Sequence, residues 1–308
     1  MSPPALGIRP REVALLVVVA FVWGFNFVVI KVGLDDFPPL LFSALRFLIS
    51  AVPAVFFVPR PKVSWAWILA IGLVFGVLLF GFLFLGIYAG MPPGLASLVM
   101  QMHVFFTILL GVVLLGERPP LVRWLAVAFG FAGIGLIAAS GGGAGNGARW
   151  TVPLLLVLAG ALSWGAHNIM MKKMPATDML GLMVWVSLIP PVPLILLSIA
   201  ADGWPRVISS VAHLSWSGLA AVAYTGFIST VFAYGVWGAM LQRHSAGTVA
   251  PFALLIPVFG LGSAAIFLGE SFGPLRIVAA VIILAALALN VLAPSLAARA
   301  ARVRYQRA

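Results

Sequence analysis

Amide, imidazole and aromatic side chains recur inside the long apolar stretches of this chain, and such groups can bind a small polar molecule. Two of the stretches, FVWGFNFVVIK and LSWGAHNIMMK, each carry a Trp-Gly pair followed seven residues later by a Lys. Asn26 follows Trp23 by three residues, and His167 follows Trp164 by three residues. In a helix, each ring would therefore share a face with its polar neighbour. We expect all four side chains to line a binding site.

A second group of candidates lies in two other apolar stretches. Gln101 and His103 stand two residues apart, and two polar groups in one buried run favour a cavity over packing. Thr230, Tyr234 and Trp237 have the i, i+4, i+7 spacing of one helix face. Their rings could shelter an apolar side chain and attract an ammonium group. The alternative for each residue of both groups is an ordinary contact between helices.

Catalysis has no support in the sequence. Hydrolysis needs a nucleophile with a base or a pair of carboxylates, but no Asp or Glu stands in the middle of an apolar stretch and no GxSxG motif occurs. The four His lack metal-ligand spacing, and the chain has no Cys. We therefore expect no enzymatic activity, no cofactor and no metal.

Arg46 is the one basic residue deep inside an apolar stretch. Two interpretations stay open at this stage. Its guanidinium could contact a bound carboxylate, or its long side chain could extend toward lipid headgroups with the charge in water.

Two acidic residues close equivalent segments, LLGERPPLVRWLAVA and FLGESFGPLRIVAAV, so that Glu117 matches Glu270 and Arg123 matches Arg276. Each Glu follows the C-terminal end of a predicted helix, where the helix dipole disfavours negative charge. We expect the neighbouring Arg to compensate in a structural salt bridge at the bundle end, with a gate latch as the alternative.

The elements that position these residues are membrane helices. Only 8% of the 308 residues are charged, 63% are hydrophobic, and the mean hydropathy is +1.17, whereas a soluble chain is about one quarter charged. A spanning helix needs about 20 apolar residues. Ten segments qualify, at 13–31, 39–58, 65–89, 94–116, 121–140, 151–171, 179–200, 214–240, 245–269 and 274–293. The GxxxG pair of Gly72 and Gly76 predicts close helix packing.

The distribution of basic residues predicts the orientation. With a cytoplasmic N-terminus, thirteen of the eighteen Lys and Arg lie inside and four lie outside, as the positive-inside rule requires. Both termini are then cytoplasmic, and the basic tail at 294–308 lies against anionic lipid headgroups. The net charge of +11 comes from scattered residues, so we expect no nucleic-acid partner.

The repeated motifs divide the chain into two halves, 13–140 and 151–293, with five predicted helices each. An odd number of helices reverses the second half relative to the first. The sequence thus predicts an all-α membrane protein with ten transmembrane helices as two inverted five-helix repeats. Such folds bind substrate near the midplane between the repeats and work by alternating access.

Several segments together, among them AFVWGFNFVVIKVGLDDFPPLLFSALRF, GMPPGLASLVMQMHVFFTILLG and AYGVWGAMLQRHSAGTVAPFALLIPVFGL, resemble the ten-helix EamA branch of the drug/metabolite transporter (DMT) superfamily. The resemblance covers almost the whole chain and is nearest to bacterial exporters of amino acids, of the O-acetylserine/cysteine and YddG types. One departure is that Pro257 in the second half is matched by Val104 in the first. We therefore expect the helix at 94–116 to be the straighter of that pair.

The resemblance implies an exporter of aromatic and small neutral amino acids and related metabolites in the bacterial inner membrane. Export of a drug cation or of a phosphorylated metabolite is the alternative, but the first would favour a carboxylate within the membrane and the second a cluster of Lys or Arg. A monomer is expected, because one chain holds both halves. His103 and His167 are the groups that could carry protons, and facilitated diffusion is an equal alternative.

Overall fold

The computed structural model describes residues 8–141, 147–175 and 177–307, and within these ranges the chain is helical with short connections and no strand. The α-helices of the first half are α1 (Pro10–Asp36), α2 (Pro39–Val55), α3 (Trp65–Ile71), α4 (Phe80–Tyr88), α5 (Pro93–Met100), α6 (His103–Leu115) and α7 (Leu121–Gly141). Those of the second half are α8 (Gly147–Lys173), α9 (Met179–Val186), α10 (Pro191–Asp202), α11 (Trp204–Ala212), α12 (Trp216–Ala223), α13 (Ala233–Arg243), α14 (Ala246–Val249), α15 (Leu255–Leu268) and α16 (Pro274–Arg307).

Three segments of other helical geometry join these α-helices without a loop. They are the π-helices η1 (Gly72–Leu79) and η2 (Tyr224–Phe232) and the 3-10 helix η3 (Ala250–Leu254). Each lies within a predicted membrane helix, and π-helical turns occur often at functional sites. In η2 the Thr230 hydroxyl donates to the Thr225 carbonyl five residues earlier (2.8 Å), a spacing that belongs to the π-helical turn.

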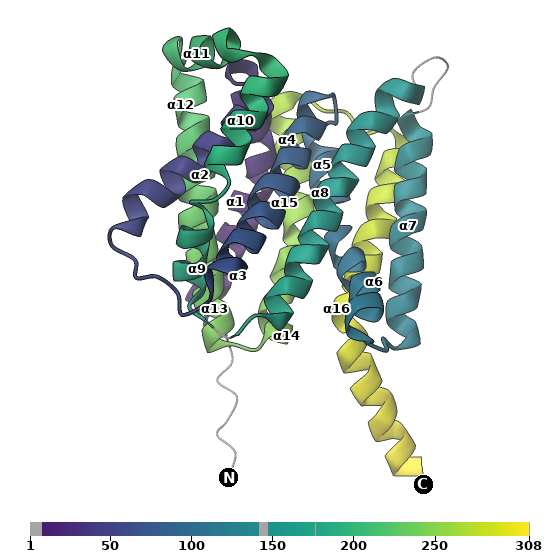
Figure 1. Cartoon of the computed structure of the whole chain (residues 1–308). Coiled ribbons are helices and arrows are strands. Elements are labelled where there is room, and N and C mark those ends of the chain that lie inside the picture. Colours follow the sequence, from purple (N-terminus) through teal and green to yellow (C-terminus); the bar gives the residue numbers. More distant parts are fainter. Residues whose placement is uncertain (1–7, 142–146, 176, 308) are drawn as a thin grey trace.

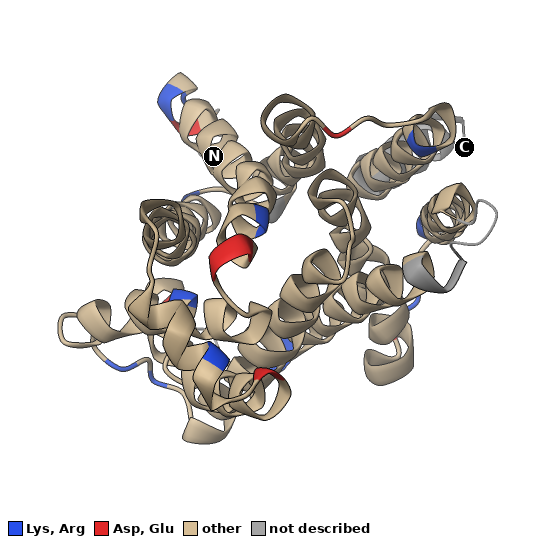
Figure 2. Cartoon of the chain, turned by 90° about the horizontal axis from the view of Figure 1, so that it is seen from above, with Lys and Arg blue, Asp and Glu red and all other residues tan. Residues whose placement is uncertain are grey.

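Nine helical stretches of the described chain are long and apolar enough to cross a membrane. Charged positions are few and isolated along the ribbons (Figure 2). The one predicted span that is missing from these nine is 39–58, which corresponds to α2 with 17 residues. At 1.5 Å per residue α2 is about 26 Å long, a little short of the ~30 Å hydrocarbon core. The chain is therefore a multi-pass membrane protein, and the number of ten spans stays a prediction.

The helices form one bundle in which elements of the two halves alternate (Figure 1). α1 packs along α15, α8 along α6, α2 along α10 and α7 along α16. α11 lies at one end of the bundle, and α16 projects from the other (Figure 1). The predicted tail continues α16 as a helix to Arg307, but the side chains of Arg299, Arg302, Arg304 and Arg307 lie outside the described set.

Glycines allow several of these helices to approach each other closely. A Cβ at Gly72 would lie 2.5 Å from Ile189 Cβ, and one at Gly76 would lie 1.9 Å from Pro190 Cγ. Both distances are shorter than any real contact, so only glycine fits. The packing role predicted for this GxxxG pair is confirmed.

Both helices of the pair 94–116 and 245–269 are interrupted, the second by η3, so the expectation that 94–116 is the straighter one stays a prediction. α5 ends at Met100 and α6 begins at His103, and between them Gln101 and Met102 form a tighter turn with bonds to the third preceding residue. The Gln101 amide donates to the Leu98 carbonyl at 3.1 Å. A proline is therefore not required to interrupt this helix.

Candidate functional site

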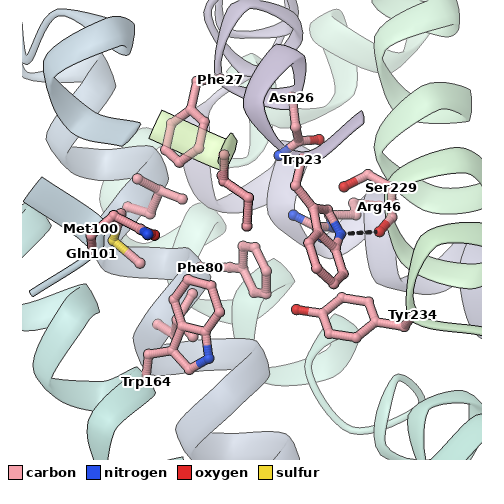
Figure 3. Close-up of a pocket in the computed structure, with 13 residues that line it drawn as sticks. Trp23, Asn26, Phe27, Arg46, Phe80, Met100, Gln101, Trp164, Ser229 and Tyr234 are labelled. Carbon is pink, nitrogen blue, oxygen red and sulfur yellow. Dashed lines mark hydrogen bonds between the residues drawn. The ribbon is translucent and has the colours of Figure 1, made fainter. Parts of the chain in front are cut away.

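A narrow cavity lies in the middle of the bundle and is lined by side chains of both halves (Figure 3). Trp23, Asn26, Gln101, Trp164 and Tyr234, all predicted from the sequence, contribute to its wall. Its free volume of about 40 Å³ would hold only a few water molecules.

Aromatic rings form one side of the central cavity. The Trp23 ring lies 5.0 Å from that of Tyr234 and 5.2 Å from that of Trp237, in tilted arrangements. Trp23 Nε1 donates to the Ser229 carbonyl at 3.0 Å, which fixes the indole between α1 and η2 (Figure 3). Trp23 and Tyr234 face the cavity, whereas Trp237 packs behind Trp23 and does not line it.

Polar atoms without protein partners face the same cavity. Asn26 Oδ1, Arg46 Nη1 and the Ser229 hydroxyl are all buried and have no hydrogen-bond partner. Arg46 is 1% exposed, so its side chain does not extend toward headgroups, and that interpretation was wrong. Its Nε donates to the Thr230 hydroxyl at 3.1 Å. Thr230 itself therefore positions Arg46 and does not line the central cavity.

A second cavity, of about 210 Å³, lies between the central cavity and one end of the bundle, lined by α6, α7, α8 and α16 and by the turn after α6. His103 belongs to this cavity and not to the central one, so Gln101 and His103 face different spaces. The His103 ring stacks on the Trp164 ring with centroids 3.9 Å apart. Since Trp164 lines the central cavity, the stacked pair stands between the two spaces.

His167 lines neither of these two cavities, contrary to the sequence prediction. It is 7% exposed, and its ring lies 4.7 Å from that of Phe75. The three-residue spacing put it on the face of Trp164, but the α4 and η1 side of the bundle covers that position.

The predicted salt bridges at the bundle ends were wrong in their partners. Glu117 pairs with Lys172 Nζ at 3.0 Å rather than with Arg123, whose Nε is buried without a hydrogen-bond partner in the wall of the second cavity. The pair joins the end of α6 to the end of α8. The sequence gives no signal that Lys172 is the partner of Glu117, since tertiary packing alone brings the two together.

Glu270 is compensated by a helix terminus and not by a salt bridge. Both carboxylate oxygens accept from the Gly94 amide at the start of α5, at 3.3 and 3.2 Å, where the helix dipole favours negative charge. Arg276 instead donates to the Ser140 hydroxyl at 3.4 Å and lies over the Trp150 ring. Burial raises the pKa of Glu270 above its usual value, and the Gly94 amide and the charge of Arg276 oppose this only in part.

Among the lining residues of the central cavity that sequence reasoning did not single out, Phe80 and Ser229 matter most for its chemistry. The Phe80 ring lies 3.8 Å from the Arg46 guanidinium carbon, and Ser229 contributes an unpartnered hydroxyl. Phe80 is one aromatic among many in an apolar stretch, so the sequence gives no signal for it. Ser229 precedes Thr230 and lies inside the π-helix η2, which the sequence did not predict.

Comparison with known proteins identifies the family. The EamA-like transporter family model matches residues 10–139 and again residues 151–292. The chain belongs to the EamA-like transporter family. This EamA-like protein is 43% identical over 284 residues to a "Probable amino-acid metabolite efflux pump" of Salmonella typhimurium, covering 90% of the chain and 93% of the relative.

Other relatives agree with this family. The protein of the same name from Escherichia coli K12 is 41% identical over 90% of the EamA-like chain and 93% of its own length. A "Probable terminal-alkyne amino-acid exporter" of Streptantibioticus cattleyicolor is 25% identical over 87% of the chain and 89% of its own length. One crystal structure superposes with a TM-score of 0.59 at 20% identity, covering 92% of this chain and 98% of that one, which is a likeness of fold.

Proposed function

We propose that this EamA-like protein exports amino acids and related small metabolites, aromatic and small neutral ones among them, across the bacterial inner membrane. The observation that carries the proposal is the central cavity, which combines ring faces with unpartnered polar atoms. Ring faces suit an apolar or aromatic side chain, and the polar atoms suit the ammonium and carboxylate groups. Two relatives at 41–43% identity carry the name of amino-acid metabolite efflux pumps.

The arrangement of the two halves supports an inverted repeat. α1 packs along α15 and α8 packs along α6, so the first helix of each half meets the fourth membrane segment of the other. The same family model also matches each half separately. In inverted repeats a central site can be opened to either side by movement of one bundle against the other.

Alternating access is supported by a difference between the two ends. Glu270 binds the amide of Gly94 and fastens α15 to α5, whereas its repeat counterpart Glu117 pairs with Lys172 beside the second cavity. With both termini cytoplasmic, the end of the bundle at Glu270 faces the outside and is closed. The second cavity then faces the cytoplasm and is the route by which substrate reaches the central cavity. Opening of the stacked His103 and Trp164 rings would join that route to the central cavity.

The alternative substrates fit the central cavity less well. No Asp or Glu contributes to its wall in the described chain, although a drug cation would be stabilised by one, and Arg46 is its one basic group, although a phosphate ester would favour several. Proton coupling through His103 or His167 and facilitated diffusion both agree with this site, and one chain as a monomer provides all of it.

Transport by purified protein in proteoliposomes tests the proposal. We expect release of phenylalanine and serine above that of protein-free vesicles, and no release of a quaternary ammonium dye or of a sugar phosphate. The assay is run with and without a pH gradient, and stimulation by the gradient would indicate proton antiport. Release of the dye or the sugar phosphate without the amino acids would contradict the proposed substrate class.

A further inference from the structure

Arg46 is a buried charge whose partner is not supplied by the described protein. The residue is 1% exposed, and in the described chain no Asp or Glu lies within 4.0 Å of it. Thr230 accepts from Nε at 3.1 Å, and Phe80 lies against the guanidinium face. Nη1 has no hydrogen-bond partner in the protein.

A guanidinium in this position can bind an anion. Arg stays charged in proteins and presents its donors as a rigid fork that matches a carboxylate. Charged groups inside a membrane are costly, so they face cavities and pair with partners there. The contacts of Thr230 and Phe80 fix the guanidinium and leave Nη1 to a ligand on the cavity side.

The wall around Arg46 also offers a complementary acceptor. Asn26 Oδ1 is buried without a partner, and Asn26 and Arg46 line the same cavity (Figure 3). An amide oxygen accepts from an ammonium group but does not neutralise it. The Trp23 and Tyr234 rings beside it can attract the same cation through their faces. The donor, the acceptor and the rings together offer groups for both the carboxylate and the ammonium of an amino acid.

We propose that Arg46 binds the α-carboxylate of the exported amino acid and that Asn26 accepts from its ammonium group. This inference rests on the proposed function and specifies the chemical class of the substrate: small zwitterions with a free carboxylate. The site tolerates different side chains, because the charged groups are held on α1 and α2 while the side chain extends toward the Phe80 and Trp164 rings. Amines and carboxamides of the same size lack the group that Arg46 recognises.

Transport of three matched compounds in proteoliposomes tests the assignment: phenylalanine, phenylalaninamide without a carboxylate, and 3-phenylpropionate without an ammonium group. Arg46→Gln should reduce phenylalanine flux about tenfold or more, because losing a hydrogen bond to a charged group weakens binding by about that factor. The weaker flux of phenylalaninamide should stay unchanged. Arg46→Lys keeps the charge without the fork and should restore part of the phenylalanine flux. Asn26→Leu should reduce phenylalanine flux but not 3-phenylpropionate flux.

The matched control is Arg243→Gln, an exposed Arg at the end of α13, which should transport as the wild type does. Equal losses of phenylalanine and phenylalaninamide flux in Arg46→Gln would make Arg46 structural and overturn the inference. If the wild type transports none of the compounds, the proposed function fails instead. Ligand-induced thermal stabilisation of the detergent-solubilised wild type then decides the inference, because equal stabilisation by phenylalanine and phenylalaninamide, or none by either, would overturn it. That comparison also holds if Arg46→Gln does not fold.

Discussion

Loss of the side chain of Glu270, which accepts from the Gly94 amide, should release the closed end of the bundle. In the structure this carboxylate accepts the Gly94 amide at 3.3 and 3.2 Å, one donor shared between two oxygens. These distances are at the long end for N–H···O hydrogen bonds. We therefore assign the contact a contribution of about 1 kcal/mol to the free energy of the closed state. Glu270→Ala would then raise the ratio of outward-open to outward-closed protein about fivefold. Gly94→Ala should act likewise, since its Cβ would lie 2.8 Å from the carboxylate.

Cysteine labelling can measure this shift, because the chain contains no Cys. Met100→Cys places a thiol in the wall of the central cavity, and an impermeant maleimide is added outside intact cells. We expect labelling about fivefold faster in the Glu270→Ala background and no acceleration in a Glu117→Ala background. Identical labelling rates with and without Glu270 would refute the idea that it holds the outer end closed.

The pH dependence of the same labelling has a defined sign. Burial raises the pKa of Glu270 in the closed state, so a proton binds the closed state more tightly than the open one, where the carboxyl is hydrated. Lowering the pH toward the ordinary Glu range should therefore favour closure and slow the labelling. Glu270→Gln keeps an acceptor for Gly94 without the charge, so its labelling should be slow at every pH. Faster wild-type labelling in acid would contradict this sign.

Two further predictions concern the cavities and the orientation. Trp164→Ala should reduce amino-acid transport strongly, because Trp164 lines the central cavity and stacks on His103, whereas Trp65→Ala, at a half-exposed position, should not. Rates are normalised to folded protein, since loss of a buried Trp can cost about 3–5 kcal/mol, and equal losses in both variants would contradict the distinction. The proposed orientation, with both termini cytoplasmic, predicts that Ser209→Cys reacts with an impermeant reagent outside intact cells and that Ser245→Cys does not. The reverse result would invert the topology.

The sequence by itself determined the class of protein and indicated several residues of the central cavity. Backbone hydrogen bonds must be satisfied within a membrane, so long apolar stretches can only be helices. The cost of burying polar groups likewise marks Asn26, Gln101 and Tyr234 before any coordinates are known. Family resemblance, duplicated motifs and the distribution of basic residues follow from the same one-dimensional information.

Only the tertiary structure decided which of these residues share a space. Only Met102 separates Gln101 from His103, but the tight turn between α5 and α6 directs them into different cavities. Contacts between helices that are distant in the sequence also decided the partners of the charged side chains. Glu117 meets Lys172 and Glu270 meets the start of α5, because helices from opposite halves end beside each other. Arg46 shows the reason most clearly: its sequence position is equally compatible with headgroups and with a ligand, and packing against Phe80 and Thr230 leaves only the cavity.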